Sequence, residues 1–240
     1  MAVQNIFKRY EVKYLLDPRQ KAAVLEAMAA HMVPDAYGKT TIRNLYYDTD
    51  NYRLIRRSLE RPVYKEKLRL RSYRQTDPDT PVFVELKKKY ESVVYKRRIP
   101  LPEQTAVQWL SGARPCDIPG QISREVDYFL SFYGPLSPKV FLSYEREAYY
   151  GKDAPDFRVT FDQDILFRQE EMTLSAGIYG TPILPPDTTL MEIKCIGGIP
   201  LWMTAVLTQQ NIRKASFSKY GTAYQKYIFP NLHKEVKTNA

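Results

Sequence analysis

Charged and apolar residues alternate along several segments of this sequence, and this alternation restricts the fold more than any other feature. In residues 63–73, lysines and arginines occupy every second position from 65 to 71, with Leu68 and Leu70 between them. Because side chains of a β-strand point alternately to its two faces, this segment is predicted to be a strand with one charged and one apolar face. The pattern recurs in five further segments, whose charged faces carry Arg9, Glu11 and Lys13; Glu85, Lys87 and Lys89; Lys96 and Arg98; Arg158 and Asp162; and Glu192 and Lys194.

Nine segments are predicted as strands and five as helices. The strand candidates are rich in Val, Ile, Tyr, Phe and Thr, and they span 6–16, 40–48, 52–58, 63–74, 81–90, 92–100, 139–149, 156–162 and 189–196. Helices are predicted at 18–32, 103–110, 119–132, 200–211 and 218–228, the first opened by Asp17 and Pro18 as N-cap and N1. Eight or nine strands joined by tight turns favour a mainly β, α+β fold with a closed antiparallel sheet. No linker or repeat divides the chain, so a single domain over 1–240 is expected.

Two arrangements are compatible with strands that have one charged and one apolar face. In the ordinary arrangement the apolar faces form a core and the charged faces meet solvent. Two features favour the inverse, in which helices cover an apolar outside and the charged faces line a wet lumen. Glu and Lys are mixed at i, i+2 spacing in three of the strands, and the helices are amphipathic and need an apolar surface to cover.

The balance of charges indicates a polyanionic ligand. The chain carries 36 Lys and Arg against 27 Asp and Glu, which gives a net charge of +9. A lumen with about a dozen cations and three or four carboxylates costs several kcal/mol per unpaired ion unless a polyanion fills it. A phosphate chain fits this requirement. The few carboxylates suit a Mg²⁺ or Mn²⁺ ion that bridges protein and substrate phosphates.

Other chemistries and locations have little support. With two histidines and two cysteines, the chain offers few residues for a catalytic triad, a zinc site or a disulfide framework. No apolar run approaches the length of a membrane-spanning helix, and the N-terminus lacks the apolar core of a signal peptide. A cytoplasmic protein is expected, with a membrane-protein partner left open.

Eight short motifs occur in the order found in one known superfamily. They are Phe7–Tyr14 (FKRYEVKY), Tyr46–Thr49 (YYDT), Lys67–Arg71 (KLRLR), Val84–Lys87 (VELK), Ser143–Arg146 (SYER), Arg158–Asp162 (RVTFD), Leu190–Lys194 (LMEIK) and Phe217–Tyr220 (FSKY). Over about residues 6–228 the sequence resembles the CYTH-like triphosphate tunnel metalloenzymes. Within them it resembles most the catalytic, polyphosphate polymerase domain of the vacuolar transporter chaperone (VTC) complex.

The resemblance implies an eight-stranded antiparallel tunnel that transfers the γ-phosphate of ATP to a growing inorganic polyphosphate chain, releases ADP and uses a divalent metal. It also implies roles for residues. Catalytic residues would be Lys13, Arg69, Arg71, Lys87, Glu192 and Lys219; phosphate-binding residues Lys13, Lys67, Arg69, Arg71, Lys87, Lys96, Arg98, Arg146, Arg158, Lys194 and Lys219; and metal ligands Glu192, Glu85 and Glu11. Tyr144 is a candidate for stacking on the adenine.

One departure from the hydrolytic relatives bears on the reaction. Those relatives begin with Glu-x-Glu-x-Lys, and this chain has Arg9, Glu11 and Lys13 at the three fixed positions. Loss of a metal-binding glutamate favours acceptance of a second anionic phosphate over activation of a water. A metal-dependent triphosphatase and a non-catalytic module that binds polyphosphate or nucleic acid stay open as alternatives, although no signature of nucleic-acid recognition occurs.

Overall fold

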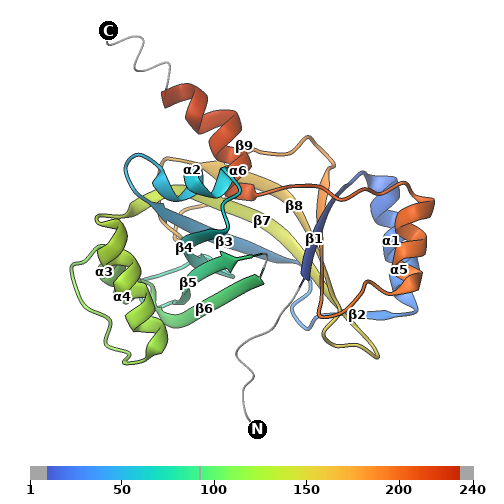
Figure 1. Cartoon of the computed structure of the whole chain (residues 1–240), viewed down its shortest axis with the longest axis horizontal. Coiled ribbons are helices and arrows are strands. Elements are labelled where there is room, and N and C mark those ends of the chain that lie inside the picture. Colours follow the sequence, from blue (N-terminus) through green and yellow to red (C-terminus); the bar gives the residue numbers. More distant parts are fainter. Residues whose placement is uncertain (1–9, 92, 233–240) are drawn as a thin grey trace. The chain divides into compact units, whose positions relative to one another are not determined.

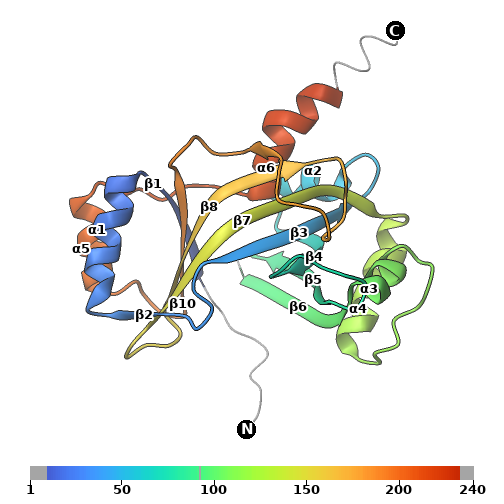
Figure 2. The same cartoon turned by 180° about the vertical axis from the view of Figure 1, so that it is seen from behind.

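The computed structural model describes residues 10–91 and 93–232, and shows antiparallel strands with helices packed beside them (Figure 1, and from behind in Figure 2). The strands are β1 (Tyr10–Leu16), β2 (Met32–Pro34), β3 (Thr40–Asp48), β4 (Tyr64–Ser72), β5 (Pro81–Tyr90), β6 (Val93–Pro102), β7 (Ser137–Gly151), β8 (Arg158–Arg168), β9 (Thr181–Pro182) and β10 (Thr189–Cys195). The helices are α1 (Pro18–Ala29), α2 (Arg53–Leu59), α3 (Glu103–Leu110), α4 (Gln121–Tyr133), α5 (Leu201–Gln209) and α6 (Lys219–Ala223), the last continued by a π-helical turn, η1 (Tyr224–Ile228). In the described part of the chain, no helix has the length and apolarity needed to cross a membrane.

The strand order confirms a sheet-rich antiparallel α+β fold and corrects its details. The order is β1-β10-β8-β7-β3-β4-β5-β6, with β2 on β7 and β9 on β8. The described residues thus form a ten-stranded sheet that ends at β1 and β6, and the expectation of a closed eight-stranded barrel was wrong. The edge of β1 that does not pair with β10 bonds to a segment outside the strands. There the N–H of Ala215 donates to the carbonyl of Lys13 at 2.7 Å, and Tyr14 forms a β-bridge with Lys214.

The chain forms two compact units, and β3, β7 and β8 run through both. The first unit consists of Met1–Thr41, Tyr144–Ile165 and Leu184–Phe217, and the second of Ile42–Ser143, Leu166–Ile183 and Ser218–Ala240. In the first unit α1 and α5 lie side by side (Figure 1) and cover the apolar face of β1, β10 and β8. The core there includes Tyr14, Met28, Phe161, Met191 and Met203.

The second unit repeats this construction with other helices. The apolar sides of β4, β5 and β6 pack against α3 and α4 (Figure 2), in a core that includes Leu68, Leu86, Trp109 and Phe129. In each unit, the helices therefore cover the apolar faces of the strands, as the alternation predicted. The charged residues of the same strands lie on the opposite face, because the period of a strand is two.

Residues 52–58 were predicted as a strand, and that prediction was wrong, because they form helix α2. Its N-terminus is held by Asp48, whose carboxylate is fully buried and accepts from the N–H groups of Leu54 and Ile55 at 2.9 and 3.0 Å. The hydroxyl of Tyr220 donates to the same carboxylate at 3.0 Å. Such capping satisfies the free N–H groups of a first helical turn. The YYDT motif thus joins β3 to α2 and ties α6 to both.

We expect Asp48→Ala to lower the free energy of unfolding by about 2 kcal/mol or more. The loss of a helix cap costs up to about 2 kcal/mol, and the buried hydroxyl of Tyr220 would lose its acceptor. Chemical denaturation followed by circular dichroism would measure this. Asp50→Ala is a matched control, since Asp50 is exposed and contacts only Lys139 among the described residues. An equal effect of the two substitutions would contradict the capping role.

Candidate functional site

The charged face of the second unit contains lysines placed directly opposite one another. Lys67 of β4 pairs with Lys87 of β5, and Lys87 pairs with Lys96 of β6. Two residues away along each strand, Lys65 of β4 pairs with Lys89 of β5. Like charges directly opposite in an antiparallel sheet destabilise it. This arrangement therefore favours a protein that binds an anion across β4, β5 and β6.

Glu85 is the counter-ion of this face. Its carboxylate is 1% exposed and lies 2.7 Å from Nη2 of Arg69, 3.7 Å from Nε of Arg71 and 2.5 Å from Nζ of Lys96. Burial by itself raises the pKa of Glu85, but the three cations outweigh it and hold that pKa well below its usual range. One carboxylate thus gathers three cations at a fixed place and leaves the cluster with a net positive charge.

The pKa of Lys96 is lowered to about 8 by burial and by the nearby charges of Arg71 and Arg69, with Glu85 acting in the opposite direction. Lys96 is therefore the cation of this cluster whose charge is most sensitive to pH near neutrality.

Further contacts orient the remaining cations of the second unit. Nη1 of Arg69 donates to the hydroxyl of Tyr46 at 2.8 Å, and Nε of Arg71 donates to Oδ1 of Asn44 at 3.0 Å. Nζ of Lys67 donates at 3.1 Å to the hydroxyl of Ser218, the N-cap of α6. Lys219, the first residue of α6, follows directly in the chain and is half-buried. The guanidinium of Arg98 lies over the ring of Phe83 at 4.8 Å.

In the first unit, Glu192 is the buried carboxylate around which cations gather, as Glu85 is in the second unit. Its carboxylate is buried, and it lies 2.9 Å from Nζ of Lys194, 3.4 Å from Nη2 of Arg146 and 3.5 Å from Nζ of Lys13. Burial alone lowers the pKa of Lys13, but Glu192 and Glu11 raise it above its usual value. Three cations therefore converge on the carboxylate of Glu192, as three converge on that of Glu85.

Asp162 and Arg158 complete this cluster on β8. The fully buried carboxylate of Asp162 accepts two hydrogen bonds of 2.6 Å from Nε and Nη2 of Arg146, the bidentate geometry that fixes a guanidinium most firmly. Arg158 lies over the ring of Tyr150 at 4.3 Å, and its buried Nε has no hydrogen-bond partner among the described residues. An unsatisfied buried donor of this kind suits an anionic ligand.

Asp162, Tyr46 and Ser218 were not predicted as site residues. The signal for Asp162 was in the sequence, since it shares a strand face with Arg158 four residues earlier. Tyr46 and Ser218 lie in two of the eight motifs, but their role depends on contacts with Arg69 and Lys67, which are distant in sequence.

The proposed metal ligands fit a divalent cation in part. Glu11 and Glu192 lie on the paired strands β1 and β10, and both converge on Nζ of Lys13, at 3.4 and 3.5 Å. Thr160, directly opposite Glu192, has a buried hydroxyl without a partner in the described residues. Mg²⁺ commonly takes one or two carboxylates and completes its shell with substrate phosphates and water. Among residues 10–91 and 93–232, however, no group of three His, Cys, Asp or Glu side chains is arranged to hold a metal ion. Glu85, in the other unit, is engaged by three cations.

Tyr144 is 3% exposed, and the guanidinium of Arg146 lies 5.2 Å from its ring centre. A ring buried in this way offers little surface to a nucleobase, so the stacking role does not fit the structure. Arg9, which separates this chain from the hydrolytic pattern, lies outside the described residues.

Comparisons with known proteins assign the sequence to a family. The model of the VTC domain matches residues 8–228. Among solved structures, the chain resembles a provisionally named adenylate cyclase from Bacillus halodurans, with 15% identity, a TM-score of 0.55, and coverage of 93% of this chain and 97% of the other. It also resembles a provisionally named adenylyl cyclase from Hippeastrum that is described as having a dominant triphosphatase activity, with 17% identity, a TM-score of 0.51, and coverage of 90% and 94%. No curated protein matches the chain.

At these identities, the likeness to solved structures is one of fold. The family match is stronger, because it covers nearly the whole sequence and every charged residue described above. The similarity predicted from the eight motifs is thereby confirmed, and the chain belongs to the VTC domain family.

Proposed function

We propose that this protein is a polyphosphate polymerase that transfers the γ-phosphate of ATP to a growing inorganic polyphosphate chain and releases ADP. The observation that carries the proposal is the row Lys67, Lys87 and Lys96, in which three lysines face one another across three strands. Together with Arg69 and Arg71 around a single carboxylate, this row supplies a surface with an excess of positive charge, which a bound polyanion would stabilise. Phosphate-binding and catalytic roles of the residues named from the family are part of this proposal.

The residues would act mainly by positioning and by electrostatic stabilisation, as is usual in phosphoryl transfer. The terminal phosphate of the acceptor is already anionic and needs no protein base. Its obstacle is repulsion from the γ-phosphate of ATP, and the preorganised cations offset this repulsion. Arg69 and Arg71 are held in place by Glu85, Tyr46 and Asn44, and their planar groups can bind non-bridging oxygens at two points.

Glu192 and Glu11 are the residues that would hold a divalent cation in the first unit. Such an ion would neutralise part of the negative charge of the substrate phosphates. Lys13 lies between the two carboxylates and would add a positive charge for binding a substrate phosphate. Arg146 stays fixed by Asp162.

The decisive experiment is to incubate the purified protein with ATP and Mn²⁺ and to separate the products by gel electrophoresis. Polyphosphate chains together with ADP would support the proposal. Free phosphate without chains would favour a triphosphatase, which the fold shared with the Hippeastrum protein makes the nearest alternative. No turnover, with tight binding of long polyphosphate, would favour a non-catalytic binding module.

The charge of Lys96 predicts a pH dependence. Because its pKa in the free protein is lowered to about 8, Lys96 loses its proton as the pH rises through this value, and its attraction for phosphate is lost with it. We expect kcat/KM for ATP to fall above this pH. Lys96→Arg keeps the charge and should move the fall to higher pH, whereas Lys226→Arg, an exposed control, should not. An unchanged profile in Lys96→Arg would contradict this assignment.

A further inference from the structure

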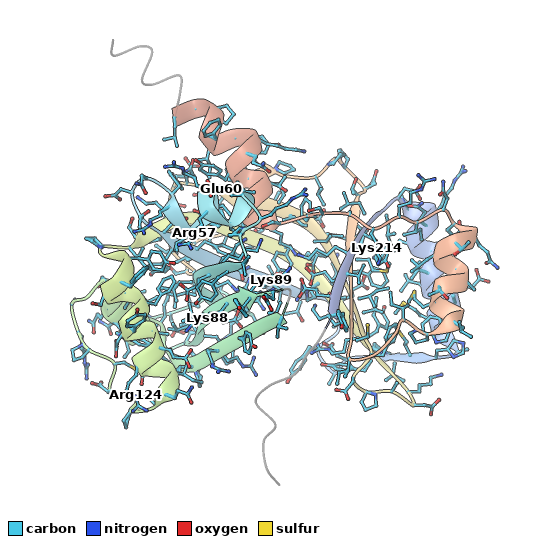
Figure 3. All side chains as sticks on the ribbon, in the orientation of Figure 1. Arg57, Glu60, Lys88, Lys89, Arg124 and Lys214 are labelled. Carbon is cyan, nitrogen blue, oxygen red and sulfur yellow. The ribbon has the colours of Figure 1, made fainter. Side chains whose placement is uncertain are left out.

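The charged face of the second unit has two ends that differ in chemistry. At one end, Arg69 and Arg71 of β4 surround Glu85, which pairs in register with Arg69 and with Arg98. At the other end, which we call the lysine end, Lys65 at the start of β4 is the direct partner of Lys89 near the end of β5. Figure 3 labels Lys89 on β5. No reacting group proposed above lies at the lysine end.

The lysine end continues the row of cations along the strands. Lys65 precedes Lys67 by two residues and Lys89 follows Lys87 by two, so each pair shares a strand face at a separation of about 7 Å. The nearest carboxylate of β4, that of Glu66, belongs to the opposite face, where the hydroxyls of Tyr64 and Tyr133 donate to it. Four lysines of two adjacent strands thus share this face.

The position of Lys65 is defined by helix α2. Its Nζ donates at 3.0 Å to the carbonyl of Ser58 in the last turn of that helix. Helix C-termini carry a partial negative charge that favours cations. Both Lys65 and Lys89 are half-buried. The pair is therefore held at the sheet and does not extend freely into solvent.

We propose that Lys65 and Lys89 form a subsite for the distal part of a long inorganic polyphosphate chain, which ATP and triphosphate do not reach. Lys65 lies four residues from Arg69, a distance of about 13 Å along the strand, and this is longer than two phosphoanhydride links. Lysine ammonium groups are flexible point charges, whereas arginine fixes phosphate oxygens at two points. Arginines at one end suit phosphates that must be held for reaction, and lysines at the other suit a chain that must move past them. This inference rests on the proposed function.

The test compares Lys65→Ala/Lys89→Ala with the control Lys39→Ala/Lys226→Ala, which removes the same charge from two exposed positions. Binding of long-chain polyphosphate and of inorganic tripolyphosphate is measured by titration calorimetry at two salt concentrations. We expect the first variant to bind the long chain several-fold more weakly, with a smaller salt dependence, and to bind tripolyphosphate as the wild type does. The control should bind both as the wild type does.

Equal affinity of the two variants for the long chain would overturn the subsite, and so would an equal loss for both ligands in the first variant. A Lys65→Gln/Lys89→Gln variant, which keeps polar side chains, repeats the measurement if the alanine variant unfolds. A separate result tests the proposed function: it fails if the wild type makes no polyphosphate from ATP. Binding of the long chain by a wild type without turnover would keep the subsite and reject the polymerase.

Discussion

Replacing Glu192 by Gln is expected to reduce phosphoryl transfer from ATP by about 100-fold or more, a loss typical of removing one preorganised electrostatic group. The amide keeps the size of the side chain and removes its charge. Lys13, Arg146 and Lys194 all lie within 3.5 Å of the carboxylate. Without its charge their mutual repulsion would displace the two lysines, while Arg146 stays fixed by Asp162. In the proposed function, the substitution also removes the principal metal ligand.

Two measurements separate these effects. Steady-state kinetics over a range of Mn²⁺ concentrations should show a fall in kcat that added metal does not restore, while thermal unfolding checks that the fold is kept. Glu147→Gln is a matched control, because Glu147 pairs only with Lys21 in the described residues, is half-exposed and lies in the same unit. Full activity of Glu192→Gln with Mn²⁺ would refute the role of Glu192.

The alternation of charged and apolar residues predicted most of the strands and the faces they present, because a period of two can be recognised in one sequence. It failed where the signal was short or ambiguous. β2 and β9 have three and two residues, too few to show a period. In α2, the apolar Leu54 and Ile55 are adjacent, and the cap that makes them helical comes from Asp48, before the helix begins.

The cations of the candidate site could be named from the sequence, but their division into one cluster around Glu85 and another around Glu192 could not. Which carboxylate gathers which cations depends on strand register: Glu85 meets Arg69 because β4 and β5 pair at those positions, and no local pattern contains that register. The tie between Asp48 and Tyr220 joins residues 172 positions apart. Closure of the sheet also depends on long-range pairing, and the bonding of Ala215 to the edge of β1 has no signature in the sequence of β1.

Glu85 gives the second large effect, on stability. We expect Glu85→Gln to lower the free energy of unfolding by about 3 kcal/mol or more, because removing one partner of a buried ion pair leaves the other charges uncompensated. Three cations depend on this carboxylate. Glu125→Gln is the control: Glu125 also pairs with two cations, Lys88 and Arg97, but is more exposed, and a pair of that kind contributes about 1 kcal/mol or less.

The pH dependence has a defined sign. Although burial raises the pKa of Glu85, the cations depress it below its ordinary value of 4.5. The stabilisation from Glu85 is therefore fully present above this value and is lost as the pH falls further into the acid range. In Glu85→Gln this contribution is absent at every pH, so the difference in stability between wild type and variant should shrink on acidification.

A bound polyanion should restore the stability that Glu85→Gln removes. Tripolyphosphate bound at Arg69, Arg71 and Lys96 would supply negative charge where the carboxylate was, and a ligand that binds only the folded state stabilises it in proportion to its affinity. The rise in melting temperature caused by tripolyphosphate should therefore be larger in Glu85→Gln than in the wild type or in Glu125→Gln. A smaller rise would mean that Glu85 contributes more by ordering the arginines than it costs by competing with the ligand. The carboxylate of Glu85 would then be required for phosphate to bind to this cluster.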